Sequence, residues 1–242
     1  MKKTVVITGA SRGIGRAAAM LFARQGFDLA LSCRNNTQLL ETLRAEAQGM
    51  GSHCLIFTGD MGDPGTCREF FGRIRERFPR IELLINNAGR SLNGLFQDMS
   101  EDQWQQLLSS NLNSAVYCSQ QAIRMMLPFQ SGCILNVSSV WGNAGASCEA
   151  AYSATKGAIN SLTKALAKEL APSHIRVNAA AFGLIDTDMN RFLTPDEQDA
   201  LTQEIPSGRM GTPEEAALLL WQLYQAPKYL TGQIVTMDGG WI

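Results

Sequence analysis

The residues best suited to chemistry in this chain are Tyr152 and Lys156, four positions apart, with Ser139 thirteen positions before the tyrosine. Side chains at positions i and i+4 share one face of a helix, and residues 151–171 have a helical pattern. An ammonium group close to a phenol favours the phenolate, so we expect Lys156 to lower the pKa of Tyr152 from its ordinary value of about 10. Such a phenol can donate and accept a proton near neutral pH. The competing interpretation is a surface lysine beside a half-buried tyrosine, and this spacing alone does not decide between the two.

A glycine-rich turn, Thr8–Gly15, follows the apolar, β-branched run Thr4–Ile7 and precedes a helical pattern that ends at Gly26. Its glycines have the spacing G-x-x-x-G-x-G, a variant of the dinucleotide-binding fingerprint. They permit a tight turn and a close approach of the backbone to a phosphate, and the helix N-terminus offers unpaired N–H groups and partial positive charge. A turn without a ligand is the alternative, but the order strand, glycines, helix favours a dinucleotide site.

Composition narrows the class of protein. The chain has 242 residues, of which 45% are hydrophobic and 18% charged, which is enough for one large α/β domain spanning residues 1–242. A net charge of −1 gives no electrostatic footprint for nucleic acid or an anionic membrane. No apolar run approaches the roughly 20 residues that span a bilayer, the N-terminus lacks the features of a signal peptide, and the six cysteines have no metal-ligand spacing. We expect a cytoplasmic, reduced protein without a metal.

Apolar, strand-like runs alternate with helical periodicity along the chain. We expect strands at residues 3–8, 28–33, 53–58, 83–86, 133–138, 175–180 and 233–237. We expect helices at residues 13–26, 36–50, 64–78, 101–127, 151–171, 195–204 and 213–225. This alternation predicts a doubly wound (Rossmann) α/β fold, with a parallel sheet of about seven strands, helices on both faces and a crevice at the carboxyl ends of the strands. The long irregular stretch 182–211 is expected to act as a lid.

Further motifs stand in a fixed order along the chain: Asp60, Asn86–Gly89, Asn111 and Asp238–Gly240. Together with the glycine-rich turn and the Ser, Tyr and Lys set, they resemble the short-chain dehydrogenase/reductase family. The resemblance covers the whole chain and is specific for fold and reaction, but much less specific for substrate. It implies a reductase that uses a nicotinamide dinucleotide and acts on a carbonyl group.

The resemblance implies a role for each of four catalytic residues. Tyr152 would be the general acid for the carbonyl oxygen, and Ser139 would hydrogen-bond that oxygen and orient it. Lys156 would lower the pKa of Tyr152 and hold the nicotinamide ribose, and Asn111, within a long helix, would anchor a water in a proton relay. Hydride arrival places negative charge on the oxygen, which preplaced donors stabilise. Taken alone, Ser139 is also reasonable as a cap at the end of a strand, and Asn111 as an ordinary polar residue of a helix. The presence of all four residues together favours catalysis.

The resemblance also implies which residues contact the dinucleotide. Asp60 would receive the adenine amino group, although it is also a reasonable turn residue, and Asn87–Gly89 would lie at the adenine-ribose side. Relatives carry Pro-Gly where this chain has Phe182-Gly183, so we expect a looser or differently shaped entry to the nicotinamide loop. The implied cofactor residues are Gly9, Ser11, Arg12, Ile14, Gly15, Arg34, Asp60, Met61, Asn87, Ala88, Gly89, Tyr152, Lys156, Gly183, Ile185 and Thr187.

The charge at the end of the second expected strand bears on the choice of cofactor. Members that bind NAD place an acid there, which would repel a 2′-phosphate. This chain has Cys33 at that position, followed by Arg34, and Arg12 lies in the glycine turn. Two guanidinium groups suit a phosphate; the alternative is that both are solvated surface arginines. We predict NADP(H).

Among relatives, the chain most resembles bacterial 3-oxoacyl-[acyl-carrier-protein] reductases, through Ser138–Val140, Lys168–Leu170 and Thr231–Gln233. Reduction of a 3-oxoacyl thioester is therefore the first expectation, with the acyl carrier protein as the partner. The arginines with which those enzymes dock the carrier correspond to Gln130 and Ser173 here. Docking of an acidic carrier is weakened accordingly.

A second resemblance concerns residues 145–149 and the Gly-Trp-Ile terminus, which look like a smaller subgroup that reduces a 5-aminopentanone group on elongation factor P. That substrate carries an ammonium, and Glu149 is the tentative substrate residue because a carboxylate near the pocket can pair with it. An exposed acid at a helix N-terminus is the alternative for Glu149.

Two further expectations concern class and assembly. A catalytically idle dinucleotide-binding scaffold is the alternative of another class, and the intact set of four catalytic residues argues against it. A homotetramer is expected, because the helices at 101–127 and 151–171 carry apolar positions on more than one side.

Overall fold

The structure is a computed structural model that describes residues 2–190 and 193–242. The described residues form a seven-stranded sheet in which all neighbouring strands are parallel. The strands are β1 (Thr4–Thr8), β2 (Asp28–Cys33), β3 (Cys54–Thr58), β4 (Leu83–Asn86), β5 (Gly132–Ser139), β6 (Ile175–Phe182) and β7 (Ile234–Met237). Their order, β3-β2-β1-β4-β5-β6-β7, reverses direction between β1 and β4. This is the doubly wound fold predicted from the sequence.

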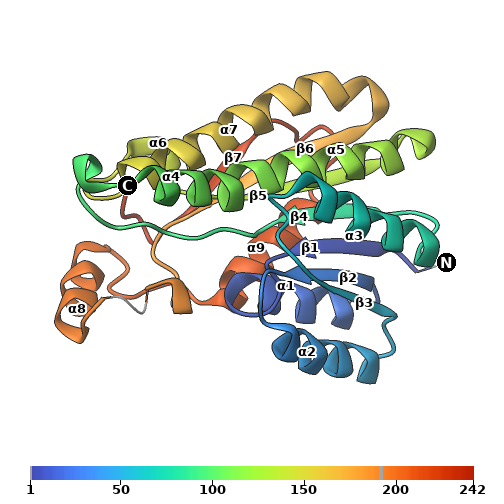
Figure 1. Cartoon of the computed structure of the whole chain (residues 1–242), viewed down its shortest axis with the longest axis horizontal. Helices are drawn as coiled ribbons and strands as arrows, with labels where there is room; N and C mark the ends of the chain where they lie inside the picture. Colours follow the sequence, from blue (N-terminus) through green and yellow to red (C-terminus); the bar gives the residue numbers. More distant parts are fainter. Residues whose placement is uncertain (1, 191–192) are drawn as a thin grey trace.

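Helices cover both faces of the sheet (Figure 1). On one face, α1 (Gly13–Arg24), α2 (Thr37–Gly49) and α9 (Pro213–Gln225) share a buried apolar cluster with the strands. On the other face, α3 (Pro64–Arg77), α5 (Ser114–Met126) and α7 (Ala150–Leu170) contribute to a second cluster. Because both faces are covered, β1 and β2 are buried along their whole length, which explains their continuous apolar sequence.

The predicted bounds agree with the observed ones to within two residues, with one informative exception. The helix expected at 101–127 is divided into α4 (Glu101–Leu108), a π-helical turn (Ser109–Asn113) and α5. A π turn inserts a residue into the helix and is frequent at functional sites. Asn111 lies in the middle of this turn and is 2% exposed, so its setting differs from the regular helix that was expected.

Figure 1 shows α6 (Trp141–Ala144), α8 (Pro195–Glu204) and the C-terminus at the end of the molecule toward which the strands run. The short helix α6 was not predicted. The stretch 182–211 contains the predicted α8, which begins with a capping box between Thr194 and Glu197, while residues 191 and 192 lie outside the described part. Among the described residues, none of the helices combines the length and the apolar character that a membrane span requires.

Candidate active site

Strand β5 and helix α7 bring the predicted catalytic groups together. Ser139 is the last residue of β5, and α7 begins two residues before Tyr152 and carries Lys156 one turn later. The Ser139 and Tyr152 side chains share a hydrogen bond, and Lys156 Nζ lies 5.6 Å from the centre of the Tyr152 ring. All three residues are buried. The predicted juxtaposition of Ser139, Tyr152 and Lys156 is therefore present in the structure.

The structure corrects the expected pKa of Tyr152. Burial is the largest effect, and it raises the pKa of the phenol above its ordinary value; the hydrogen bond with Ser139 acts in the opposite direction, and the Glu149 charge raises the pKa further. Lys156, whose ammonium donates to the Val137 carbonyl at 2.9 Å, does not contribute to this shift. Burial also lowers the pKa of Lys156, to about 8. Tyr152 is consequently a protonated phenol across neutral pH.

Asn111 uses its amide to join two parts of the site. Its Oδ1 accepts from the Arg90 N–H at 2.8 Å, and its Nδ2 donates to the Arg90 carbonyl at 2.9 Å and to Thr155 Oγ1 at 3.1 Å. Thr155 Oγ1 in turn donates to the Tyr152 carbonyl at 2.7 Å. Asn111 therefore fastens the segment after β4 to the catalytic helix, a role that sequence reasoning missed. Its expected contact with a water in a proton relay stays a prediction.

The glycine turn is packed against the end of β4. Gly9 has a φ of +65°, and a Cβ at this position would lie 2.9 Å from the Ala88 Cα. The Asn87 amide donates to the carbonyls of Thr8 and Gly9 at 3.0 Å each, and a Cβ at Gly15 would overlap the Gly9 carbonyl oxygen. Only glycine fits at positions 9 and 15 of this turn. The N-terminus of α1 follows directly on this turn, the arrangement in which a dinucleotide phosphate is expected to bind.

The loop after β6 reaches the glycine turn. Thr187 packs on it, because a Cβ at Gly13 would lie 3.2 Å from the Thr187 methyl group. Ile185 pairs with Gly211 in an isolated parallel bridge. Phe182, where relatives have proline, is the buried last residue of β6, and its carbonyl accepts from the Val140 N–H at 3.0 Å. Phe182 is thus part of the sheet, and the expected looser or differently shaped loop entry after it stays a prediction.

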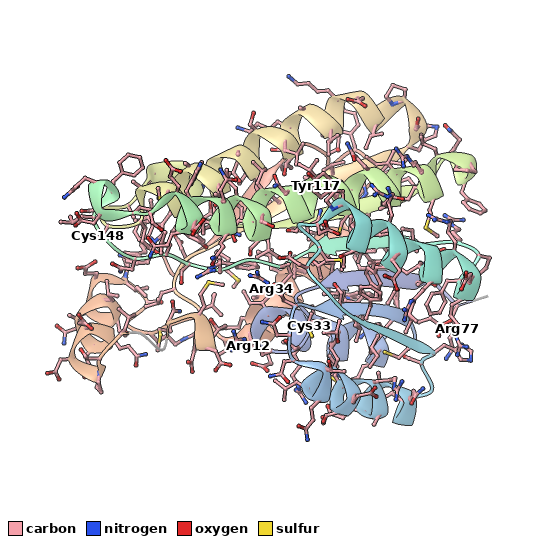
Figure 2. All side chains as sticks on the ribbon, in the orientation of Figure 1. Arg12, Cys33, Arg34, Arg77, Tyr117 and Cys148 are labelled. Carbon is pink, nitrogen blue, oxygen red and sulfur yellow. The ribbon has the colours of Figure 1, made fainter. Side chains whose placement is uncertain are left out.

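The two arginines predicted to hold a 2′-phosphate lie at the ends of adjacent strands. Arg12 follows β1 and Arg34 follows β2, and Figure 2 shows both near Cys33. Arg12 Nη1 lies 3.3 Å from Asp188, and Arg34 Nε lies 3.3 Å from Asp60. The arginine side chains are 65% and 49% exposed, so each ion pair is worth at most about 1 kcal/mol and a phosphate dianion can compete for either arginine.

Two other predicted cofactor positions have structural roles of their own. Asp60 Oδ1 accepts from the Gly62 N–H at 2.8 Å, so the alternative interpretation of Asp60 as a turn residue also holds. The side chain of Met61 is buried in the apolar cluster beneath α3 and α5. Only the backbone of Met61 is consequently suited to contact a cofactor.

Glu149 lies where the sequence predicted it, beside the catalytic tyrosine. It immediately precedes α7, burial raises the pKa of its carboxyl group, and a hydrogen bond with the Trp141 side chain acts in the opposite direction. Its charge is close enough to raise the pKa of Tyr152. The competing interpretation holds in part, because Glu149 is the N-cap residue of α7, although it is only partly exposed.

A pocket of about 240 Å³ adjoins the start of α7. Its lining combines residues from the segment 92–103 with Cys148, Ala150 and Ala151. Two of its lining residues, Leu92 and Met99, also pack against the buried cluster that contains Tyr152. The pocket therefore offers space for an apolar group close to the proposed proton donor. The lining residues are Leu92, Asn93, Gly94, Leu95, Phe96, Asp98, Met99, Gln103, Cys148, Ala150 and Ala151.

Comparison with known proteins extends these observations. The short chain dehydrogenase family model matches residues 3–198. The chain is 37% identical to the uncharacterized oxidoreductase YmfI of Bacillus subtilis, covering 100% of this chain and 99% of that protein. It is 36% identical to the 3-oxoacyl-[acyl-carrier-protein] reductase FabG of Chlamydia pneumoniae, covering 98% and 96% of the two chains.

Solved structures agree with the family match. YwfH, an NADPH-dependent reductase involved in bacilysin biosynthesis, superimposes with a TM-score of 0.93 at 25% identity, covering 100% of this chain and 99% of YwfH. A short-chain type dehydrogenase/reductase from Mycobacterium marinum has the same TM-score at 32% identity, covering 99% and 95% of the two chains. The chain therefore belongs to the short-chain dehydrogenase family, whose members bind a nicotinamide dinucleotide, and it is an oxidoreductase that acts on CH–OH or C=O groups.

Proposed function

We propose that this chain reduces a ketone with NADPH and that Tyr152 is the proton donor. The observation that carries the proposal is a buried phenol that shares a hydrogen bond with Ser139 and lies beside the buried Lys156. The raised pKa keeps Tyr152 protonated at neutral pH, as reduction requires, and a pKa of about 8 leaves Lys156 largely charged there. The site is consequently prepared to give a proton to an oxygen that gains charge.

In the proposed reaction, the substrate carbonyl oxygen accepts hydrogen bonds from the Tyr152 and Ser139 hydroxyls. The reduced nicotinamide supplies the hydride when bound. As the carbonyl carbon gains the hydride, negative charge develops on the oxygen, and Tyr152 transfers its proton there while Ser139 stabilises the charge. The Lys156 ammonium lies beside the ring of the phenolate that remains and would hold the cofactor ribose. Tyr152 then regains a proton from solvent through the relay assigned to Lys156 and Asn111.

Charge around the ribose site supports NADPH rather than NADH. Strand β2 ends in the neutral Cys33, so no carboxylate stands at the position where an acid would repel a 2′-phosphate. Arg12 and Arg34 are exposed, and within the described residues each forms a weak surface ion pair. The phosphate would replace Asp188 and Asp60 as the partner of these guanidinium groups. The structural relative YwfH is itself described as NADPH-dependent.

A 3-oxoacyl thioester is the first proposed substrate. The FabG relatives carry that activity in their names, and the pocket at the start of α7, lined by both apolar and polar residues, offers space for an acyl chain. Docking of an acidic carrier has little support, because Gln130 and Ser173 replace the docking arginines. Arg176, a basic residue three positions after Ser173, donates to the carbonyls of Leu223 and Tyr224 at 3.0 and 2.6 Å. The Arg176 guanidinium thus satisfies two carbonyl groups at the C-terminal end of α9.

One observation favours a second candidate, the 5-aminopentanone group on elongation factor P. The Glu149 carboxyl lies beside Tyr152, and burial makes its charge costly unless a cation pairs with it. An ammonium on the substrate would supply that cation.

Turnover of NADPH with purified protein tests the proposed function. Wild type should oxidise NADPH in the presence of an acetoacetyl thioester or a cationic ketone. Tyr152→Phe should lower kcat by about a hundredfold or more, since general acid catalysis contributes on the order of 10²–10⁴-fold. Fluorescence titration should show that this variant still binds NADPH. Absence of ketone reduction by wild type, or full turnover by Tyr152→Phe, would overturn the proposal.

A further inference from the structure

The last five residues of the chain are held in a fixed shape. Asp238 follows β7, and its carboxylate accepts from the Gly240 and Ile242 N–H groups at 3.0 Å each. Gly239 and Gly240 have φ values of +70° and +86°, which turn the chain back on itself. Asp238 also packs against Gly183, where a Cβ would lie 2.7 Å from the Asp238 Cβ. The tail is therefore anchored to the start of the loop after β6.

This shape brings Trp241 onto Trp141. The two ring centres are 4.9 Å apart, and the rings meet edge to face at 64°. Aromatic pairs of this geometry are favourable beyond the area that they bury. Figure 1 shows the C-terminus close to α6, the short helix that begins with Trp141. Trp241, one hundred positions later in the sequence, thus packs against the Trp141 ring.

Trp141 belongs to the immediate surroundings of the catalytic groups. Its N–H donates to Ser139 Oγ at 3.2 Å, and its side chain shares a hydrogen bond with Glu149. Its ring packs against the buried cluster that includes Tyr152. The Trp141–Trp241 pair is therefore continuous with the site at which a carbonyl would lie.

Helix α6 holds Trp141 firmly against α7. Gly142 contacts the Lys156 carbonyl so closely that a Cβ at this position would lie 2.9 Å from its oxygen. Asn160 donates to Asn143 Oδ1 at 2.8 Å and accepts from Ser138 Oγ at 2.6 Å. Helix α6, which carries Trp141, is consequently packed against α7, the helix that carries Tyr152 and Lys156.

We infer that Trp241 is a specificity-determining residue: together with Trp141 it forms the outer wall of the ketone site and contacts the part of the substrate beyond the carbonyl. The inference rests on the proposed ketone reduction. An aromatic wall stabilises a substituent long enough to reach it, whether apolar or cationic, and does nothing for a ketone with only short substituents. Trp241 therefore selects by size, while the chemistry stays with Ser139, Tyr152 and Lys156.

Steady-state kinetics on ketones of graded size test this inference. Trp241→Ala should raise KM for 4-phenylbutan-2-one by about tenfold, the effect of losing one aromatic contact. Its kcat, its KM for butan-2-one and its affinity for NADPH should be unchanged. Trp241→Phe should restore most of the loss, and Tyr229→Ala, which changes a fully exposed residue, is the control. Trp241→Leu replaces the alanine variant if that variant does not fold by circular dichroism.

The outcomes separate the two proposals. In one outcome, wild type reduces ketones while the Trp241 variants change KM for small and large ketones by the same factor, or for neither. That result would overturn the role of Trp241 in specificity and leave the proposed ketone reduction intact. If kcat falls and KM does not change, Trp241 is only structural and the inference is overturned. If wild type reduces no ketone at all, the proposed function fails and the inference fails with it.

Discussion

Replacement of Glu149 by glutamine should distinguish the two proposed substrates. Glutamine keeps an oxygen that can accept from the Trp141 side chain, so the local geometry should survive while the charge is lost. The carboxyl group is withdrawn from solvent and lies close enough to Tyr152 to influence the phenol pKa. An ion pair with a cationic substrate in such a setting is worth about 1.4 kcal/mol or more, which is tenfold in kcat/KM.

The assay compares two ketones of matched shape, 5-(trimethylammonio)pentan-2-one and its neutral carbon analogue, 6,6-dimethylheptan-2-one. Glu149→Gln should lower kcat/KM about tenfold for the cation. It should leave the neutral ketone unaffected or improved, because loss of the Glu149 charge removes an effect that raises the Tyr152 pKa. Glu169→Gln, an exposed acid on the same helix, is the matched control. Higher salt should weaken the preference for the cation.

The pH dependence gives an independent check. Burial raises the pKa of Glu149, so its charge is lost as pH falls through a value above the ordinary range for glutamate. The preference of wild type for the cationic ketone should therefore decline on the acid side, and Glu149→Gln should show no such decline. Equal effects of the substitution on both ketones would refute recognition by charge and favour the 3-oxoacyl thioester.

Three further predictions concern the cofactor, the lysine and the assembly. Joint replacement of Arg12 and Arg34 by alanine should raise KM for NADPH, with each lost contact costing roughly 1.5–3 kcal/mol before solvent screening. The kinetics with NADH should change little. Equal use of NADH and NADPH by wild type would contradict the predicted phosphate contacts. The rate of reduction should fall as pH rises through about 8, where Lys156 loses its charge, and a flat profile from pH 7 to about 9.5 would argue against a charged Lys156. Light scattering should report a homotetramer, because α7 carries an outward apolar stripe at residues 154, 158 and 162; a monomer at micromolar concentration would exclude it.

The fold could be predicted because its signals are local and repeated. Strands buried on both faces read as apolar runs, and helices between them show their own period, so the order of elements requires a parallel, doubly wound sheet. The glycine turn and the Tyr152–Lys156 pair could be predicted for the same reason: each motif is contiguous, and its spacing indicates its geometry. Contacts between residues far apart in the chain gave no such signal. Arg12 meets Asp188 across 176 positions, and Trp241 meets Trp141 across one hundred.

The π turn at Ser109–Asn113 shows a second limit of sequence reasoning. One inserted residue changes the direction of Asn111 without disturbing the apolar period on either side, so the segment reads as one helix. The change is large in space, since it lets the amide reach Arg90 and Thr155 at the same time. On the α3 side, the Asp60 turn packs so closely on this segment that a Cβ at Gly62 would overlap Ser109. The Asp60 turn and the Asn111 contacts with the catalytic helix thus meet at one short turn.

The pKa of Tyr152 shows why a correct pairing of residues does not yield their electrostatics. The sequence places an ammonium four positions away, and that neighbour alone favours the phenolate. In the structure, burial acts on both groups: it raises the pKa of Tyr152 and lowers that of Lys156. Each shift disfavours charge in the empty interior, so the pair is most stable with a neutral phenol. A protonated phenol can serve as the general acid for an oxygen that gains negative charge, so in the proposed reaction proton transfer accompanies hydride arrival.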